Sequence, residues 1–138
     1  MKPFKILDIS GDVGLTAYGR SEEEAFANAA VGMYSLITDP GAIHEKKALD
    51  ISVENRSREG LLVSWLNELI FHFDAYGFIG KKIDIGFFSE NKMIAKVLGE
   101  DFDPGHHEGN LLIKAATYHR LRIEKKNNLW EIDVIFDI

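Results

Sequence analysis

The stretch LLVSWLNELIFHFDAYG, residues 61–77, decides the fold class of this 138-residue chain. Its apolar positions recur every three or four residues with polar side chains on the other side, as in a helix that buries one face. These apolar positions are Leu61, Leu62, Trp65, Leu66, Leu69, Ile70 and Phe73. The pattern ends at Gly77, a residue type that commonly terminates helices. The chain after Gly77 has strand character to its end.

Short apolar or alternating runs predict strands on both sides of that helix. Residues 48–53 alternate apolar and polar side chains, as in a strand with one buried face. Polar, turn-like segments separate the later runs, and the longest of these is the predicted loop at residues 99–110. The predicted strands are residues 4–9, 13–18, 48–53, 82–88, 93–98, 111–116, 121–124 and 130–136.

A second helix is predicted between the strands at residues 13–18 and 48–53. Ser21 followed by Glu24 forms a capping box, and apolar residues then recur at helical spacing. The sequence Asp-Pro-Gly at residues 39–41 ends this helix. Two helices combined with mainly antiparallel strands indicate an α+β fold. The sequence leaves open whether the sheet closes into a barrel.

Composition predicts one domain spanning residues 1–138, a length that can bury a substantial core without disulfides. The chain has no cysteine, which excludes thiolate metal sites and cysteine nucleophiles and favours a reducing, cytoplasmic location. No segment approaches the roughly 20 apolar residues of a membrane span. The net charge of −6 disfavours direct RNA binding, because such binding depends on Lys and Arg that neutralise phosphates. A role with RNA would therefore pass through a partner protein.

Hard oxygen ligands for a divalent cation occur at two places in the sequence. Asp12 lies in the break between the first two predicted strands, where it is either a turn former or a metal ligand, and turn formation is the commoner role. At the other end, the Asp137 carboxylate and the Ile138 α-carboxylate are oxygen donors of the type that Ca²⁺, Mg²⁺ or Mn²⁺ prefers. A solvated chain end is the alternative there.

The segment DFDPGHH, residues 101–107, combines two carboxylates and two imidazoles. Adjacent histidine side chains tend to diverge, and no matching ligand pair is visible elsewhere in the sequence, so we interpret the segment as a polar functional loop rather than a zinc site. Lys114 interrupts an apolar strand, where an outward-facing lysine is the default. No nucleophile elbow, Walker loop or dinucleotide-binding glycine pattern is present, so no catalytic machinery is recognisable.

Taken together, five separated segments resemble the archease family over nearly the whole chain. They are residues 8–15 with 17–19 (DISGDVGL, AYG), 21–30 with 32–33, 61–69, 114–119 (KAATYH) and 134–138 (VIFDI). The resemblance implies an α+β fold, a bound divalent cation that is usually Ca²⁺, and partnership with the RtcB-type RNA ligase of tRNA splicing and RNA repair.

The resemblance also implies roles for individual residues. Asp12, Asp137 and Ile138 match the metal ligands of the family, with Ca²⁺ expected and Mg²⁺ or Mn²⁺ as alternatives. Lys114 matches a lysine near the functional tip, and His107 matches the histidine of an Asp-Pro-x-x-His loop. The family usually has His-Thr-Ala-Asp where this chain has Ile9-Ser10-Gly11-Asp12, so a role that needs an imidazole at residue 9 is not expected. The carboxylate site does not depend on that imidazole.

The function implied by the resemblance is that of an accessory protein, not an enzyme, which promotes guanylylation and multiple turnover of the ligase. The alternative is a stand-alone metal-dependent enzyme that acts on a phosphate-containing substrate, with a cation at Asp12 and Asp137 as Lewis acid. Such an enzyme usually needs a positioned base or an anion clamp, and the sequence shows neither a glycine-rich phosphate loop nor an arginine cluster. The accessory role is therefore preferred.

Overall fold

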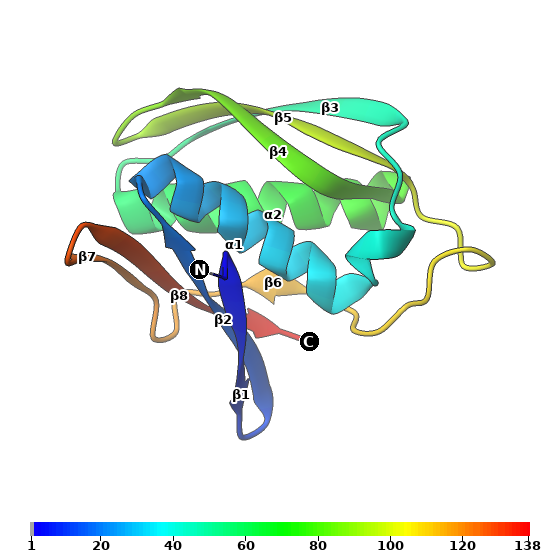
Figure 1. Ribbon diagram of the computed structural model, residues 1–138, viewed down its shortest axis with the longest axis horizontal. Coiled ribbons are helices and arrows are strands. Elements are labelled where there is room, and N and C mark those ends of the chain that lie inside the picture. The colour runs from blue at the N-terminus through cyan, green and yellow to red at the C-terminus, as the bar shows by residue number, and fades with distance from the viewer. Residues whose placement is uncertain (1) are drawn as a thin grey trace.

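The computed structural model describes residues 2–138 as two antiparallel sheets with two helices between them (Figure 1). The helices are α1 (Glu22–Ile37) and α2 (Arg58–Tyr76), and a short 3-10 helix, η1 (Pro40–Ala42), follows α1. The larger sheet contains β1 (Phe4–Ile9), β2 (Asp12–Gly19), β6 (Ala115–Ala116), β7 (Arg122–Lys126) and β8 (Leu129–Asp137). The smaller sheet contains β3 (Lys47–Glu54), β4 (Phe78–Phe88) and β5 (Lys92–Asp101).

Strand order brings the two ends of the chain together in the larger sheet. The order is β1-β2-β8-β6, with β7 also paired to β8, so β2 and β8 are neighbours at its centre. Their antiparallel register runs from Val13 opposite Phe136 to Gly19 opposite Trp130. The smaller sheet has the order β3-β5-β4. The α+β prediction is confirmed, and the two described sheets do not close into a barrel.

The apolar faces of the two helices meet in the core between the sheets. Leu66 and Leu69 of α2 are fully buried, as the periodicity of residues 61–77 predicts. Burying one such leucine contributes about 1.5–3 kcal/mol. Trp65 is also fully buried, and its indole N–H donates to the Phe26 carbonyl of α1 at 3.0 Å. This bond lets the largest core side chain be buried without leaving a polar atom unpaired.

Two of the helix boundaries that the sequence indicates, the start of α1 and the end of α2, are confirmed. Ser21 accepts a hydrogen bond from the Glu24 backbone N–H at 3.1 Å, as a capping box requires. The Glu24 carboxylate accepts from the backbone of Arg20, one residue before the cap. Gly77 ends α2 with φ 72°, a left-handed conformation that favours glycine. No helix among residues 2–138 is long and apolar enough to cross a membrane.

Several of the sequence-based boundaries are wrong, among them the start of the strand predicted at residues 82–88, which begins at Phe78 as β4. The strand predicted at residues 111–116 shrinks to Ala115–Ala116, because the N–H groups of Asn110 and Leu111 donate to the terminal carbonyls of α1 instead of pairing in the sheet. The loop predicted at residues 99–110 begins later, because β5 continues to Asp101. This extension exists because β4 starts at Phe78, which pairs with Asp101.

Candidate functional site

The turn end of the β1–β2 hairpin lies beside the end of β8. Because Val13 pairs with Phe136 in antiparallel register, Asp12 and Asp137 both lie one residue beyond this pair, at the same end. Gly11 forms the hairpin turn with φ 80° and delivers Asp12 to this position. Asp12 is half-buried, whereas Asp137 and Ile138 are exposed. The fold therefore brings together the sequence-predicted aspartates from opposite ends of the chain.

Lys114 lies directly next to this chain end. Its backbone N–H donates to the Asp137 carbonyl at 2.8 Å, and the following residue, Ala115, pairs with Asp137. The side chain of Lys114 is exposed. Asn67 of α2 holds the short strand β6 in place, because its Oδ1 accepts from the Ala116 N–H at 2.8 Å. Three of the predicted site segments thus meet at one end of the larger sheet.

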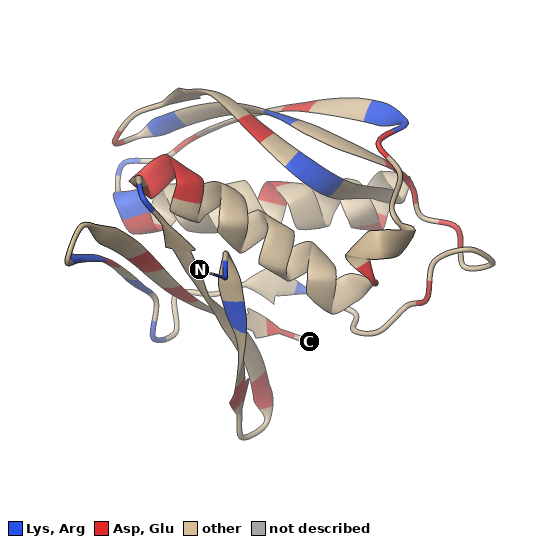
Figure 2. Ribbon diagram, in the orientation of Figure 1, with Lys and Arg blue, Asp and Glu red and all other residues tan. Residues whose placement is uncertain are grey.

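The donor atoms at this end fit a hard divalent cation. Asp12, Asp137 and the α-carboxylate of Ile138 are all oxygen donors, the class that Ca²⁺ and Mg²⁺ prefer. No ion pair within residues 2–138 involves Asp12 or Asp137, so these carboxylates are not already neutralised by Lys or Arg. Figure 2 shows acidic residues at the turn end of the β1–β2 hairpin and at the end of β8. A cation between them would offset the repulsion of like charges.

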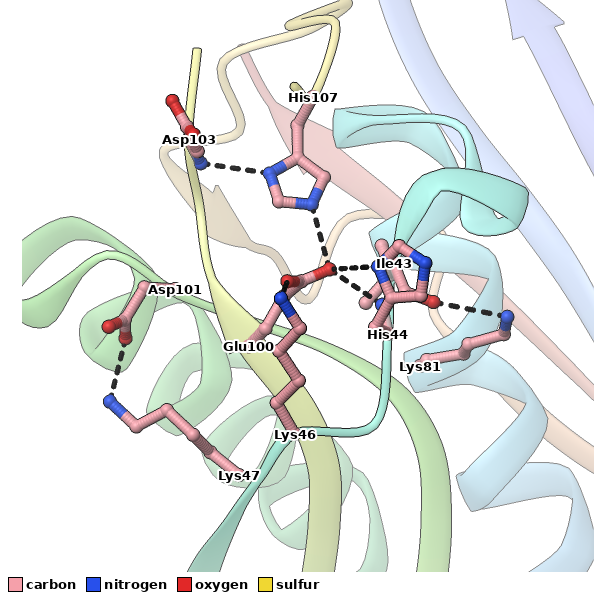
Figure 3. Close-up of polar contacts among 9 residues, drawn as sticks. All are labelled: Ile43, His44, Lys46, Lys47, Lys81, Glu100, Asp101, Asp103 and His107. Atoms are coloured by element: carbon pink, nitrogen blue, oxygen red, sulfur yellow. Dashed lines mark hydrogen bonds and ion pairs between the residues drawn. The ribbon is translucent and has the colours of Figure 1, made fainter. Parts of the chain in front are cut away.

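Within residues 2–138, His107 has no hydrogen bond or ion pair with these residues and lies in a different cluster (Figure 3). Its ring is buried, with 1% of its surface exposed. Nδ1 accepts from the Asp103 backbone N–H at 2.8 Å, so the proton of the neutral ring lies on Nε2, which donates to Glu100 Oε2 at 3.0 Å. These contacts fix the loop after β5 onto that strand.

Glu100 is the centre of this second cluster, and sequence reasoning missed it. It is buried at the end of β5, where its Oε2 accepts from the His44 backbone N–H at 2.6 Å. This bond, helped by the hydrogen bond from His107, lowers the pKa of Glu100 to about 2, although burial acts in the opposite direction. The apolar run of residues 93–98 is followed by Gly99 and two acidic residues, so the sequence carried no signal that the strand extends to Glu100.

A third polar network lies on the larger sheet and is centred on Arg122. Its guanidinium donates to Asp133 at 2.8 Å, Glu124 at 2.6 Å and Glu131 at 3.0 Å. These carboxylates raise the pKa of Arg122, and Arg122 lowers the pKa of Glu124. Every member of the network has a partner, so it stabilises the β7–β8 pair and offers no free group for chemistry.

Comparison with known proteins assigns the family. The model of the archease protein family matches residues 4–138. The protein archease of Sulfurisphaera tokodaii is 32% identical to this chain over 139 residues, and the match covers the full length of both proteins. The protein archease of Aeropyrum pernix is 34% identical, with 94% of this chain and 92% of that protein covered.

Solved structures agree with this assignment. The solution structure of Methanobacterium thermoautotrophicum protein 1598 is 31% identical, has a TM-score of 0.79 and is matched over its full length. An archease of Thermotoga maritima, described as a possible chaperone, has a TM-score of 0.66 at 19% identity, with 97% of this chain and 96% of that chain covered, and shows the shared fold. The family match over almost the whole sequence and the relatives above 30% identity show that this chain belongs to the archease family.

Proposed function

We propose that this protein is a metal-binding accessory protein that activates an RtcB-type RNA ligase in tRNA splicing and RNA repair. One observation carries the proposal: the fold gathers Asp12, Asp137 and Lys114, which the archease resemblance assigns to function, at one end of one sheet. Activation would mean faster guanylylation of the ligase and more turnovers per ligase molecule. The lack of cysteine supports a cytoplasmic location.

The proposed cation is Ca²⁺, with Mg²⁺ or Mn²⁺ as alternatives, held by Asp12, Asp137 and the α-carboxylate of Ile138. When bound, it supplies positive charge that neutralises these carboxylates and joins the start of β2 to the end of β8. Asp12 is half-buried and placed by a hairpin, so it provides the rigid part of the site. Asp137 and Ile138 are exposed at the end of β8 and provide the ligands from the other strand.

Lys114 is the proposed contact residue for the ligase. Its backbone N–H is bonded to the Asp137 carbonyl, so a cation held at Asp137 would also hold the position from which the exposed ammonium group projects. A positive charge placed this way can pair with an acidic or phosphate group of the ligase complex. RNA is reached only through the ligase, in agreement with the net charge of −6.

The test combines purified protein with the ligase, RNA ends, GTP and Mn²⁺, and measures the guanylylation rate and the number of turnovers. Lys114→Ala should lose most of the stimulation, whereas Lys125→Ala, which removes an exposed lysine on β7, should keep it. If the wild-type protein changes neither quantity, the proposal is wrong. Phosphoester hydrolysis by the isolated protein that is abolished by Asp12→Ala would favour a stand-alone enzyme instead.

A further inference from the structure

Three ligand-bearing side chains from separate segments meet next to the buried His107. His44 comes from the segment between η1 and β3, Glu100 from the end of β5, and His106 from the loop that follows β5. One ligand atom from each lies within 4.8 Å of the other two. Figure 3 shows His44 and Glu100 pointing toward one another across the gap between β5 and the segment before β3.

We propose that His44, Glu100 and His106 form a second metal site that binds a transition ion such as Zn²⁺. The sequence alone shows no matching ligand for the loop containing His106 elsewhere in the chain. The fold supplies this ligand from His44, which is 56 positions from Glu100 in the sequence. The site goes beyond the proposed ligase activation and does not depend on it.

The distances are close to those of a coordinated ion. Two ligand atoms of a tetrahedral ion with bonds of about 2.1 Å lie about 3.4 Å apart. His44 Nδ1 and Glu100 Oε2 are 3.3 Å apart, so the imidazole already lies within one such spacing of the carboxylate, whose other oxygen, Oε1, is the one available to the ion. The rings of His44 and His106 are stacked, with 5.4 Å between their centroids and 20° between their planes. Both histidines are exposed, so rotation of their side chains can shorten the remaining edges.

Glu100 is held as a metal-binding carboxylate needs to be. Its Oε2 accepts from the His44 backbone N–H at 2.6 Å and from His107 Nε2 at 3.0 Å, and the Asp103 N–H fixes the tautomer of His107. Such outer hydrogen bonds orient the ligands of metal sites. Among the described residues, the other oxygen, Oε1, has its one ion-pair contact with Lys46 Nζ, at 3.7 Å. The Lys46 side chain is 67% exposed and can move into solvent when an ion binds.

The donor set selects the class of ion. Two imidazoles and one carboxylate are the ligands of zinc sites that keep one position open, whereas Ca²⁺ takes six to eight oxygens. The ion at this site and the ion proposed at Asp12 and Asp137 are therefore of different classes. A bound ion would join the segment before β3 to the loop after β5, and its open position would accept water or an oxygen of a ligand.

The test titrates the full-length protein with Zn²⁺ in saturating Ca²⁺, which occupies the oxygen site, and repeats the titration with Co²⁺ as a spectroscopic probe. One ion should bind per chain, with a tetrahedral Co²⁺ absorption band and shifts of the His44 and His106 ring signals in NMR. His44→Ala and His106→Ala should each weaken binding about tenfold or more. His119→Ala, which removes an exposed histidine outside the cluster, and Asp12→Asn should leave it unchanged.

Three results would overturn the proposal: no saturable binding, binding unaffected in a variant that lacks both His44 and His106, or binding lost with Asp12→Asn. Circular dichroism and thermal melts check that the variants fold, which is expected because both histidine side chains are exposed. Substitution of Glu100 is avoided as the main test, because its carboxylate also bonds His107 and the backbone. Ligase activation is measured separately, so a failure here leaves the proposed function intact.

Discussion

Asn67→Ala should loosen the strand that places Lys114. Asn67 lies on α2 and connects the helix to β6, where its Oδ1 accepts from the Ala116 N–H at 2.8 Å. Its Nδ2 contacts the Ala116 carbonyl at 3.5 Å. Ala116 is 4% exposed, so the substitution leaves its N–H without a partner in a site that water hardly reaches.

The size of the effect follows from these two contacts. A buried donor left unpaired costs about 1–3 kcal/mol. The contact at 3.5 Å is too long to contribute much. We therefore expect the free energy of unfolding to fall by about 2 kcal/mol, which corresponds to a fall in Tm of roughly 6–10 °C for a domain of this size.

Chemical denaturation and thermal melts measure this loss, and ligase activation measures its consequence. β6 has two residues, so loss of its anchor should also move Lys114 relative to Asp137 and reduce activation more than stability alone explains. Glu68→Ala is the matched control, because Glu68 is the next residue on α2 and faces His72 at the surface. Stability within about 0.5 kcal/mol of wild type for Asn67→Ala would refute the reasoning.

Further predictions concern the cation, the acid range and the packing of the smaller sheet. Saturating Ca²⁺ should raise Tm, because an ion that binds only the folded state at 100 times its Kd adds about 2.7 kcal/mol, and Asp12→Asn should remove most of this rise. The lowered pKa of Glu100, about 2 against a usual 4.5, means that its contribution to stability is complete above pH 4.5 and is lost as the pH falls toward 2. Unfolding measured between pH 5 and 2 should show this loss in the wild type, and a smaller pH dependence in Glu100→Gln. Gly99→Ala should destabilise the protein by several kcal/mol in denaturant titrations, because a Cβ on β5 would clash with the Ile79 carbonyl of β4. A wild-type melting profile for Gly99→Ala would show that the two strands are not packed as described.

Local patterns were sufficient for the helices and for most strands. The capping box at Ser21 and the left-handed Gly77 are decided by a few neighbouring residues, and both were predicted correctly. Local patterns could not predict that residues 110–113 lie outside the sheet. Asn110 and Leu111 complete the end of α1, a long-range contact that competes with strand pairing. An apolar run alone does not show which of these partners it will find.

Some residues of the candidate sites could likewise be predicted from the sequence, and others could not. By composition, Asp12 and Asp137 are more often turn and chain-end residues than metal ligands, and only the family resemblance favoured a metal role. The register of β2 and β8 explains why they lie at the same end of the sheet. Glu100 and His44 gave no signal, because their relation depends on the β4–β5 extension and on the path of the chain after η1. His107 stays a predicted tip residue, and its contacts in the structure are with Glu100 and Asp103 rather than with the chain end.

The most direct test of the central claim is the rate of ligase guanylylation with wild-type protein, with Asp137→Ala and with Ile138 deleted. Both changes lie at the exposed chain end, outside the helices and the buried core, so the variants should fold and melt like the Ca²⁺-free wild type. We expect the wild type to accelerate guanylylation and both variants to lose this effect. Equal acceleration by all three proteins would contradict the claim that the chain end is the working site.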